Sequence, residues 1–164
     1  MELLDIYDIK GNKLNKTIDR ANKKDLAENE YIKIVSVWIK SDHKYLIQYC
    51  SKEKGNIYNT TGGHVSSGNS SLQQAIIETK EEIGLDLKES DLTYLGQVIR
   101  PNMLFDVYIH EDETQELINH TFDLQKEEVE EICWLSKNDI EDLILKNIFK
   151  SITAEGYFKF IKNS

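Results

Sequence analysis

Residues 63–85 read GHVSSGNSSLQQAIIETKEEIGL, and this stretch decides the fold of the chain. It predicts a short helix, because apolar residues recur at helical spacing within it. The N-capping residues Asn69, Ser70 and Ser71 come before this run, and Gly84, a typical helix-ending residue, comes after it. We expect the helix to begin near Ser71. One side of it carries an apolar stripe of Leu72, Ala75, Ile76, Thr79 and Ile83. The helix can therefore bury this side against the rest of the chain.

Three glutamates occupy the neighbouring sector of the predicted helix. Glu78, Glu81 and Glu82 stand at i, i+3 and i+4, so their side chains share one face. Like charges at this spacing destabilise a surface helix by about 0.2–0.5 kcal/mol per pair. A divalent cation, which prefers oxygen ligands, would relieve that repulsion. The alternative interpretation is a solvated acidic face, which is common in a chain with 29 Asp and Glu residues.

The residues around the glutamates resemble the Nudix box, and they extend over the whole of that motif. The box is a glycine, five residues, Glu, seven residues, Arg-Glu, an aliphatic residue, any residue, Glu-Glu, any residue, then glycine and an aliphatic residue. The positions that match are Gly63, Glu78, Glu81, Glu82, Gly84 and Leu85. The preceding residues 60–65, TTGGHV, are similar to the strand that leads into the box in this family.

Three positions depart from the box pattern. Asn69 stands where the first Glu is expected, Ile77 where the Arg is expected, and Thr79 at the aliphatic position. Thr79 points to the core side, where its methyl group can pack. Asn69 and Ile77 together remove one negative and one positive charge. If these positions form an ion pair in ordinary members, losing both avoids leaving one buried charge without a partner.

The rest of the chain predicts an α/β fold. A turn at Lys10-Gly11-Asn12 joins two short strands into an N-terminal β-hairpin. The run YIKIVSVWIK, residues 31–40, is apolar on both faces, as in a central buried strand. Further strands are expected at 45–50, 61–65, 92–99, 105–110 and 129–135, and a second helix from a capping box at Ser136 and Asp139 to about Phe149. The resemblance implies an α/β/α sandwich with a mixed central sheet.

Length and composition indicate one domain over residues 1–164. We divide it into a hairpin and loop (1–30), a core (31–149) and a C-terminal tail (150–164). A net charge of −9 argues against a large nucleic-acid footprint. No apolar run has the length of a membrane span and no basic secretion signal opens the chain, so we expect no membrane partner and a cytoplasmic location. Cys50 and Cys133 are interpreted as buried thiols.

The resemblance also implies a function and a set of site residues. Nudix enzymes usually hydrolyse a diphosphate linkage, often in a nucleoside diphosphate derivative, by attack of water activated by Mg²⁺ or Mn²⁺. The implied metal ligands are the box glutamates Glu78, Glu81 and Glu82 with the carbonyl group of Gly62. Glu128, six residues before Trp134, resembles the late ligand of the family, and Glu127 is the second choice. Glu81, Glu82 and Glu128 are the catalytic candidates. Many members pair, which suggests a homodimer.

Other residues have weaker roles by the same reasoning. His64 could approach phosphate, although a structural hydrogen bond is the simpler interpretation, and Arg100 and Tyr58 are candidates to line the pocket. Residues 4–20 are similar to the opening of Nudix proteins related to isopentenyl-diphosphate isomerase. The isomerase reaction itself relies on a cysteine near the strand that enters the box, and residues 59–63, NTTGG, contain none. A catalytically weak binding or regulatory domain is the alternative function.

Asn69 and Ile77, which replace a charged pair of the box pattern, lead to a prediction about turnover. If Asn69 and Ile77 replace an ion pair, the double variant Asn69→Glu/Ile77→Arg should raise turnover by more than the two single changes combined. Steady-state kinetics of the four proteins measure this difference. Additive or negligible effects would remove the ion-pair explanation.

Overall fold

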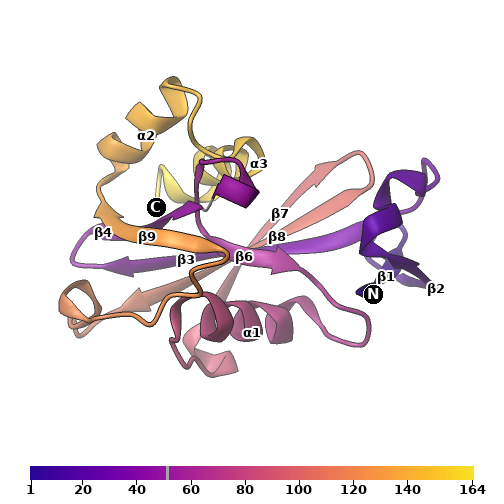
Figure 1. Ribbon diagram of the computed structural model, residues 1–164, viewed down its shortest axis with the longest axis horizontal. Coiled ribbons are helices and arrows are strands. Elements are labelled where there is room, and N and C mark those ends of the chain that lie inside the picture. Colours follow the sequence, from indigo (N-terminus) through magenta and orange to yellow (C-terminus); the bar gives the residue numbers. More distant parts are fainter. Residues whose placement is uncertain (51) are drawn as a thin grey trace.

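A mixed β-sheet forms the middle layer of the molecule (Figure 1). The computed structural model describes residues 1–50 and 52–164. Within them the sheet has seven strands in the order β5-β4-β3-β8-β7, with β6 on β3 and β9 on β4. The strands are β3 (Ile32–Ser41), β4 (Lys44–Cys50), β5 (Tyr58–Asn59), β6 (Thr61–His64), β7 (Thr93–Arg100), β8 (Met103–Asp112) and β9 (Val129–Leu135). This arrangement confirms the predicted α/β sandwich with a mixed sheet.

Strand β3 is the centre of the sheet, as its two apolar faces predict. It runs parallel to β8 and antiparallel to β6. Val35, Val37 and Ile39 project to the face covered by α1 (Ser71–Ile83). Trp38 projects to the opposite face, covered by α2 (Lys137–Leu145) and α3 (Ser151–Gly156). Figure 1 shows the sheet between these helices. The alternation of side chains along one strand therefore supplies both cores of the sandwich.

The N-terminal hairpin forms as predicted. Strand β1 (Leu3–Tyr7) pairs antiparallel with β2 (Lys13–Asp19), and the 3-10 helix η1 (Arg20–Asp25) follows. Both Asp5 carboxylate oxygens accept hydrogen bonds from the loop before α1, at 2.7 Å from the Ser67 hydroxyl and 3.0 Å from the Gly68 amide. These bonds hold the hairpin against the box, and they place η1 beside β6.

The box helix begins and ends where the sequence predicts. Ser70 is the N-cap of α1 and forms a capping box with Gln73. Gly84 ends the helix in a left-handed conformation with φ 72°.

No helix among the described residues has the length and apolar composition needed to cross a membrane. Short 3-10 helices complete the chain at η2 (Lys52–Lys54), η3 (Glu89–Asp91) and η4 (Leu117–Asn119).

The C-terminal part differs from the sequence prediction in two ways. The capping box at Ser136 forms, but α2 ends at Leu145 rather than near Phe149, because Asn147 adopts a left-handed φ of 57°. Residues 150–164 are not a tail. They form α3 and a following π-helix (Tyr157–Ile161), whose Tyr157 and Ile161 side chains are fully buried. The sequence of this segment alone did not predict a helix. Its side chains are buried by contacts with strands that are far away in the sequence.

The burial of the C-terminal segment predicts its contribution to stability. Ile161→Ala should lower the free energy of unfolding by about 2–5 kcal/mol, because it leaves a cavity in a closed core. Leu145→Ala removes a large apolar side chain that is 81% exposed, so it should change stability by no more than about 0.5 kcal/mol. Urea unfolding of both variants makes the comparison. Equal, small effects would mean that the segment is dispensable for the core.

Candidate active site

The strand that leads into the box, β6, approaches its neighbours closely at two glycines. A Cβ atom on Gly62 would overlap the carbonyl oxygen of Val35 on β3. A Cβ atom on Gly63 would lie 2.5 Å from Oε1 of Glu78. Gly62 therefore lets β6 lie close to β3, and Gly63 lets the backbone of β6 lie directly against the Glu78 carboxylate of α1.

Glu82 is the most deeply placed of the box carboxylates. Its side chain is buried, and its Oε1 accepts a hydrogen bond from the Gly62 amide at 3.0 Å. Burial raises the pKa of Glu82 to about 8, with the negative charges of Glu78 and Glu128 acting in the same direction and the Gly62 bond opposing them. A buried carboxylate of this kind is costly to ionise without a positive partner.

Glu78 lies one helical turn earlier and is held by a neutral amide. Gln74 Nε2 donates to Glu78 Oε1 at 2.8 Å, and Gln74 Oε1 accepts from the side chain of Asn69 at 3.0 Å and from the Ser66 amide at 3.1 Å. Burial raises the pKa of Glu78 to about 7, with the Gln74 bond opposing the shift and the nearby charge of Glu81 adding to it. Asn69, the first departure from the box, thus acts through Gln74 on a carboxylate.

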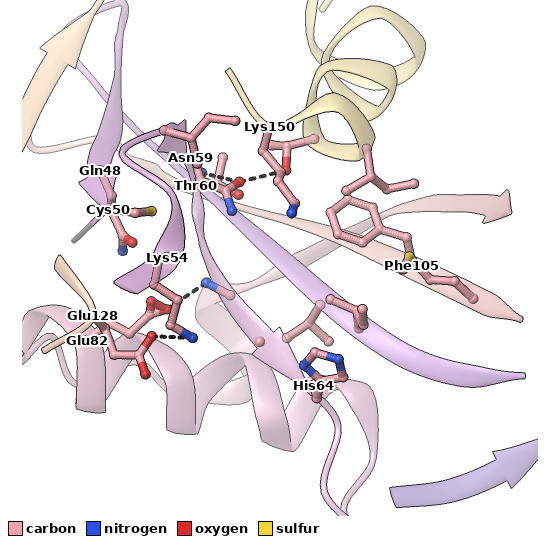
Figure 2. Close-up of a pocket in the computed structure, with 18 of the residues that line it drawn as sticks. Gln48, Cys50, Lys54, Asn59, Thr60, His64, Glu82, Phe105, Glu128 and Lys150 are labelled. Carbon is pink, nitrogen blue, oxygen red and sulfur yellow. Dashed lines mark hydrogen bonds and ion pairs between the residues drawn. The ribbon is translucent and has the colours of Figure 1, made fainter. Parts of the chain in front are cut away.

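Glu128 faces the same region from the segment before β9. Its carboxylate forms an ion pair with Lys54 at 2.7 Å, as Figure 2 shows beside Glu82. The third box carboxylate, Glu81, is exposed, and Glu127 also lies outside the residues that line the pocket. Among residues 1–50 and 52–164, no three His, Cys, Asp or Glu side chains are gathered tightly enough to form a metal site in this arrangement.

A pocket of about 290 Å³ opens beside β6 and brings these residues together. Glu82 and Glu128 line it, with Gly62, Gly63 and His64 along one wall. The wall opposite comes from the C-terminal segment, where the Thr153 hydroxyl donates to the Asn59 side chain at 2.6 Å. Figure 2 shows Glu82 and His64 on opposite sides of the view. The pocket therefore combines a buried carboxylate end with a second end around His64.

His64 is a neutral side chain among cations. It is 8% exposed, and its Nε2 lies 3.2 Å from Nζ of Lys23. Burial, together with the positive charges of Arg20, Lys23, Lys54 and Lys150, lowers the pKa of His64 to about 3. The structural hydrogen bond expected for His64 is present. The pocket around it is positively charged.

The structure also shows where the reasoning from sequence missed or misplaced residues. Arg100 does not line the pocket, because its guanidinium group pairs with Glu155 at 2.7 Å. Tyr58 does not line it either, since its ring packs on Tyr49. The sequence analysis did not single out Gln74. Its position four residues before Glu78 places the two side chains next to each other on a helix, so the sequence could have predicted their hydrogen bond. The lining lysines carry no such local signal.

Comparison with known proteins identifies the family. The model of the NUDIX domain matches residues 31–155, which is most of the chain. Among curated proteins, no sequence match was found.

Solved structures share the fold at low sequence identity. DR0079 from Deinococcus radiodurans matches with a TM-score of 0.79 and 16% identity, over 98% of this chain and 100% of that one. A Nudix hydrolase from Nitrosomonas europaea matches with a TM-score of 0.58 and 17% identity, over 76% and 84% of the two chains. A bifunctional NMN adenylyltransferase/ADP-ribose pyrophosphatase from Francisella tularensis, solved with AMP and a Mn ion, has a TM-score of 0.59 and 12% identity, over 76% and 39%.

The family match covers the strand β6, the helix α1 and the sheet on which they pack. The fold and the register of the box agree with it. This chain belongs to the Nudix family of hydrolases, which act on pyrophosphate linkages.

Proposed function

We propose that this protein hydrolyses the diphosphate linkage of a small phosphorylated substrate in a reaction that depends on a divalent cation. The observation that carries the proposal is the pair of box carboxylates, Glu78 and Glu82, packed against β6 beside an open pocket. Burial raises their pKa values to about 7 and about 8, and nearby acidic charges, including that of Glu128, act in the same direction on both. Such a pair is stable in its ionised form only when a positive charge joins it.

The donor set fits Mg²⁺ or Mn²⁺. Carboxylate and carbonyl oxygens are the ligands that these hard cations prefer. Glu82 supplies a buried carboxylate and Glu78 a half-buried one, and Gly63 places no side chain against Glu78. The one cation close to this end of the pocket, among the described residues, is Lys54, which pairs with Glu128. That ion pair is partly exposed, so exchanging it for another cation costs little.

We propose that Glu78, Glu82 and Glu128 hold the ion together with the Gly62 carbonyl, and that Glu81 is an additional ligand or base. Glu81 is exposed, so it contributes less than the other two box glutamates. A bound divalent ion would neutralise the diphosphate and lower the pKa of a water molecule. The bifunctional NMN adenylyltransferase/ADP-ribose pyrophosphatase, part of which shares this fold, was solved with AMP and a Mn ion, in keeping with the proposed ion and phosphorylated substrate.

The residues of this chain position the reactants and receive the proton. The oxygen of the water bonds to one phosphorus, and the bond from that phosphorus to the bridging oxygen breaks. The electron pair stays on the bridging oxygen, which leaves as part of the second phosphate. The proton of the water passes to a carboxylate, and Glu82 and Glu128 are the candidates that line the pocket. Gly62 N–H fixes one Glu82 oxygen, so the other oxygen is available as the acceptor.

A second candidate function is binding without efficient turnover. The observation that favours it is the chain of hydrogen bonds from Asn69 through Gln74 to Glu78, which begins at Asn69, where the family pattern has a glutamate. A binding domain of this kind would recognise the same phosphorylated compounds. Kinetic measurements separate it from a hydrolase.

The proposed function predicts a strong effect of Glu82→Gln. On a panel of diphosphate compounds with Mg²⁺ or Mn²⁺, this variant should lose at least about a hundredfold in kcat, because it removes the buried acceptor and an anionic ligand. Glu81→Gln, on the exposed side of the same helix, should lose much less. Chelation of the metal should abolish turnover of the wild type. Turnover that persists in Glu82→Gln or in chelator would refute the proposed site.

The raised pKa values also predict how stability depends on pH when metal is removed. Between about pH 4.5 and pH 8 the folded protein keeps protons on Glu78 and Glu82 that the unfolded chain has released. The free energy of unfolding therefore falls as pH rises through this window. Glu82→Gln should make the fall shallower, whereas Glu89→Gln, at an exposed position, should not. Urea unfolding in chelator from pH 5 to pH 8.5 checks this, and equal slopes in all three proteins would contradict it.

A further inference from the structure

Four cations gather at one pocket of a chain whose net charge is −9. Arg20 and Lys23 come from η1, Lys54 from η2, and Lys150 from the residue before α3. Segments far apart in the sequence thus bring like charges to the same opening. The repulsion between them is a cost that the folded protein accepts at this place.

Two of these cations have acidic partners and two do not. Lys54 pairs with Glu128 at 2.7 Å, and Arg20 pairs with Glu2 at 3.0 Å. Lys23 contacts His64, whose Nε2 must accept from it because an ammonium group only donates. The Lys150 ammonium group has no hydrogen-bond or ion-pair partner within residues 1–50 and 52–164. Lys23 and Lys150 therefore present positive charge that no described carboxylate neutralises.

One of the two unneutralised lysines, Lys23, lies at the His64 end of the pocket. Gly62 contacts Glu82, and His64, the partner of Lys23, is two residues farther along β6, which is about 7 Å. Figure 2 shows the Lys150 side chain pointing into the pocket above both His64 and the Glu82–Glu128 pair, and its charge acts to lower the pKa of His64 and of Lys23. Of the described acidic residues, only Glu82 and Glu128 line the pocket.

The charges of this pocket exceed what one diphosphate requires. A divalent ion on the carboxylates would meet the charge of the linkage that is cleaved, so Lys23 and Lys150 remain for another anion. We propose that the end of the pocket around His64 binds a further phosphate group of the substrate, through Lys23 and Lys150 with Arg20 nearby. The preferred substrate is then an organic diphosphate that carries at least one phosphate beyond the linkage that is cleaved. This inference rests on the proposed function.

The organic part of such a substrate has a surface beside these lysines. Ile34 and Phe105 are register partners on β3 and β8, and both line the pocket. Ile34 is also the register partner of His64. An apolar floor therefore lies next to the cationic rim, as a phosphorylated organic group requires. The further phosphate has two sources, the third phosphate of a nucleoside triphosphate or a phosphate monoester on the organic part.

Two matched pairs of substrates test the proposal and separate the two sources. A nucleoside triphosphate is compared with its diphosphate, and coenzyme A, which carries a 3′-phosphate, with dephospho-coenzyme A. Wild-type protein should show a kcat/KM about tenfold or more higher for the member with the further phosphate in one pair, and the pair that shows it names the source. No preference in either pair would overturn the proposal.

Matched lysine variants show whether these residues cause the preference. Lys23→Gln and Lys150→Gln should remove most of this preference by raising the KM for the member that carries the further phosphate. Lys24→Gln, in η1 next to Lys23, and Lys146→Gln, near Lys150, are exposed changes outside the pocket and should keep it. A preference that survives Lys23→Gln and Lys150→Gln, or that falls equally in the control variants, would overturn the proposal.

A binding measurement keeps the proposal independent of turnover. Without metal, tripolyphosphate should bind the wild type and both control variants, and it should bind Lys23→Gln and Lys150→Gln about tenfold more weakly in calorimetry. Equal binding by all five proteins would overturn the inference even in an active hydrolase. If no compound is turned over with metal, the proposed function fails, while weaker tripolyphosphate binding by the two pocket variants would still support the phosphate site.

Discussion

The structure depends on one constraint, the burial of the Glu82 carboxylate under the backbone of β6. Gly62 donates to it, and Gly63 leaves room for Glu78 one turn away. A side chain at Gly63 would collide with Glu78 on α1, and one at Gly62 would collide with the backbone of β3. The sheet holds β6 in place through β3, and the capped helix α1 holds the glutamates. The protein thus holds two carboxyl groups at a fixed position, ready to ionise when a cation joins them, and the rest of the fold keeps that position from relaxing.

Local patterns were enough to predict much of this arrangement. The two-faced strand β3, the N-terminal hairpin and the caps of α1 and α2 depend on neighbours in sequence, and the structure confirms each of them. The same holds for the register of the box, which places Glu78 and Glu82 on the face toward β6. These features follow from side-chain period and capping chemistry, which act over a few residues. The assignment of the metal ligands, and the likeness to the isomerase subgroup, stay predictions.

No local sequence pattern predicted the positively charged end of the pocket. Lys23 and Lys150 are 127 positions apart (150 − 23), and only the packing of η1 and α3 beside β6 brings them to one cavity. Among 20 basic residues, nothing local separates these two from Arg100, which pairs with Glu155 instead. The C-terminal helices were missed for the same reason, because Tyr157 and Ile161 gain their burial from distant strands. Tertiary contacts, rather than propensity, decide these parts.

The wall that the C-terminal segment contributes has a consequence for how the protein is made. Lys150, Ile152 and Thr153 line the pocket, and Thr153 donates to Asn59, so residues 94 positions apart must meet before the pocket is complete. The box helix and its strand leave the ribosome about 70 residues earlier than this wall, by the difference between positions 153 and 83. During that interval the nascent chain carries the glutamates without the enclosure around them. The pocket is therefore complete only after residues 150–153 have been synthesised and have folded beside β6.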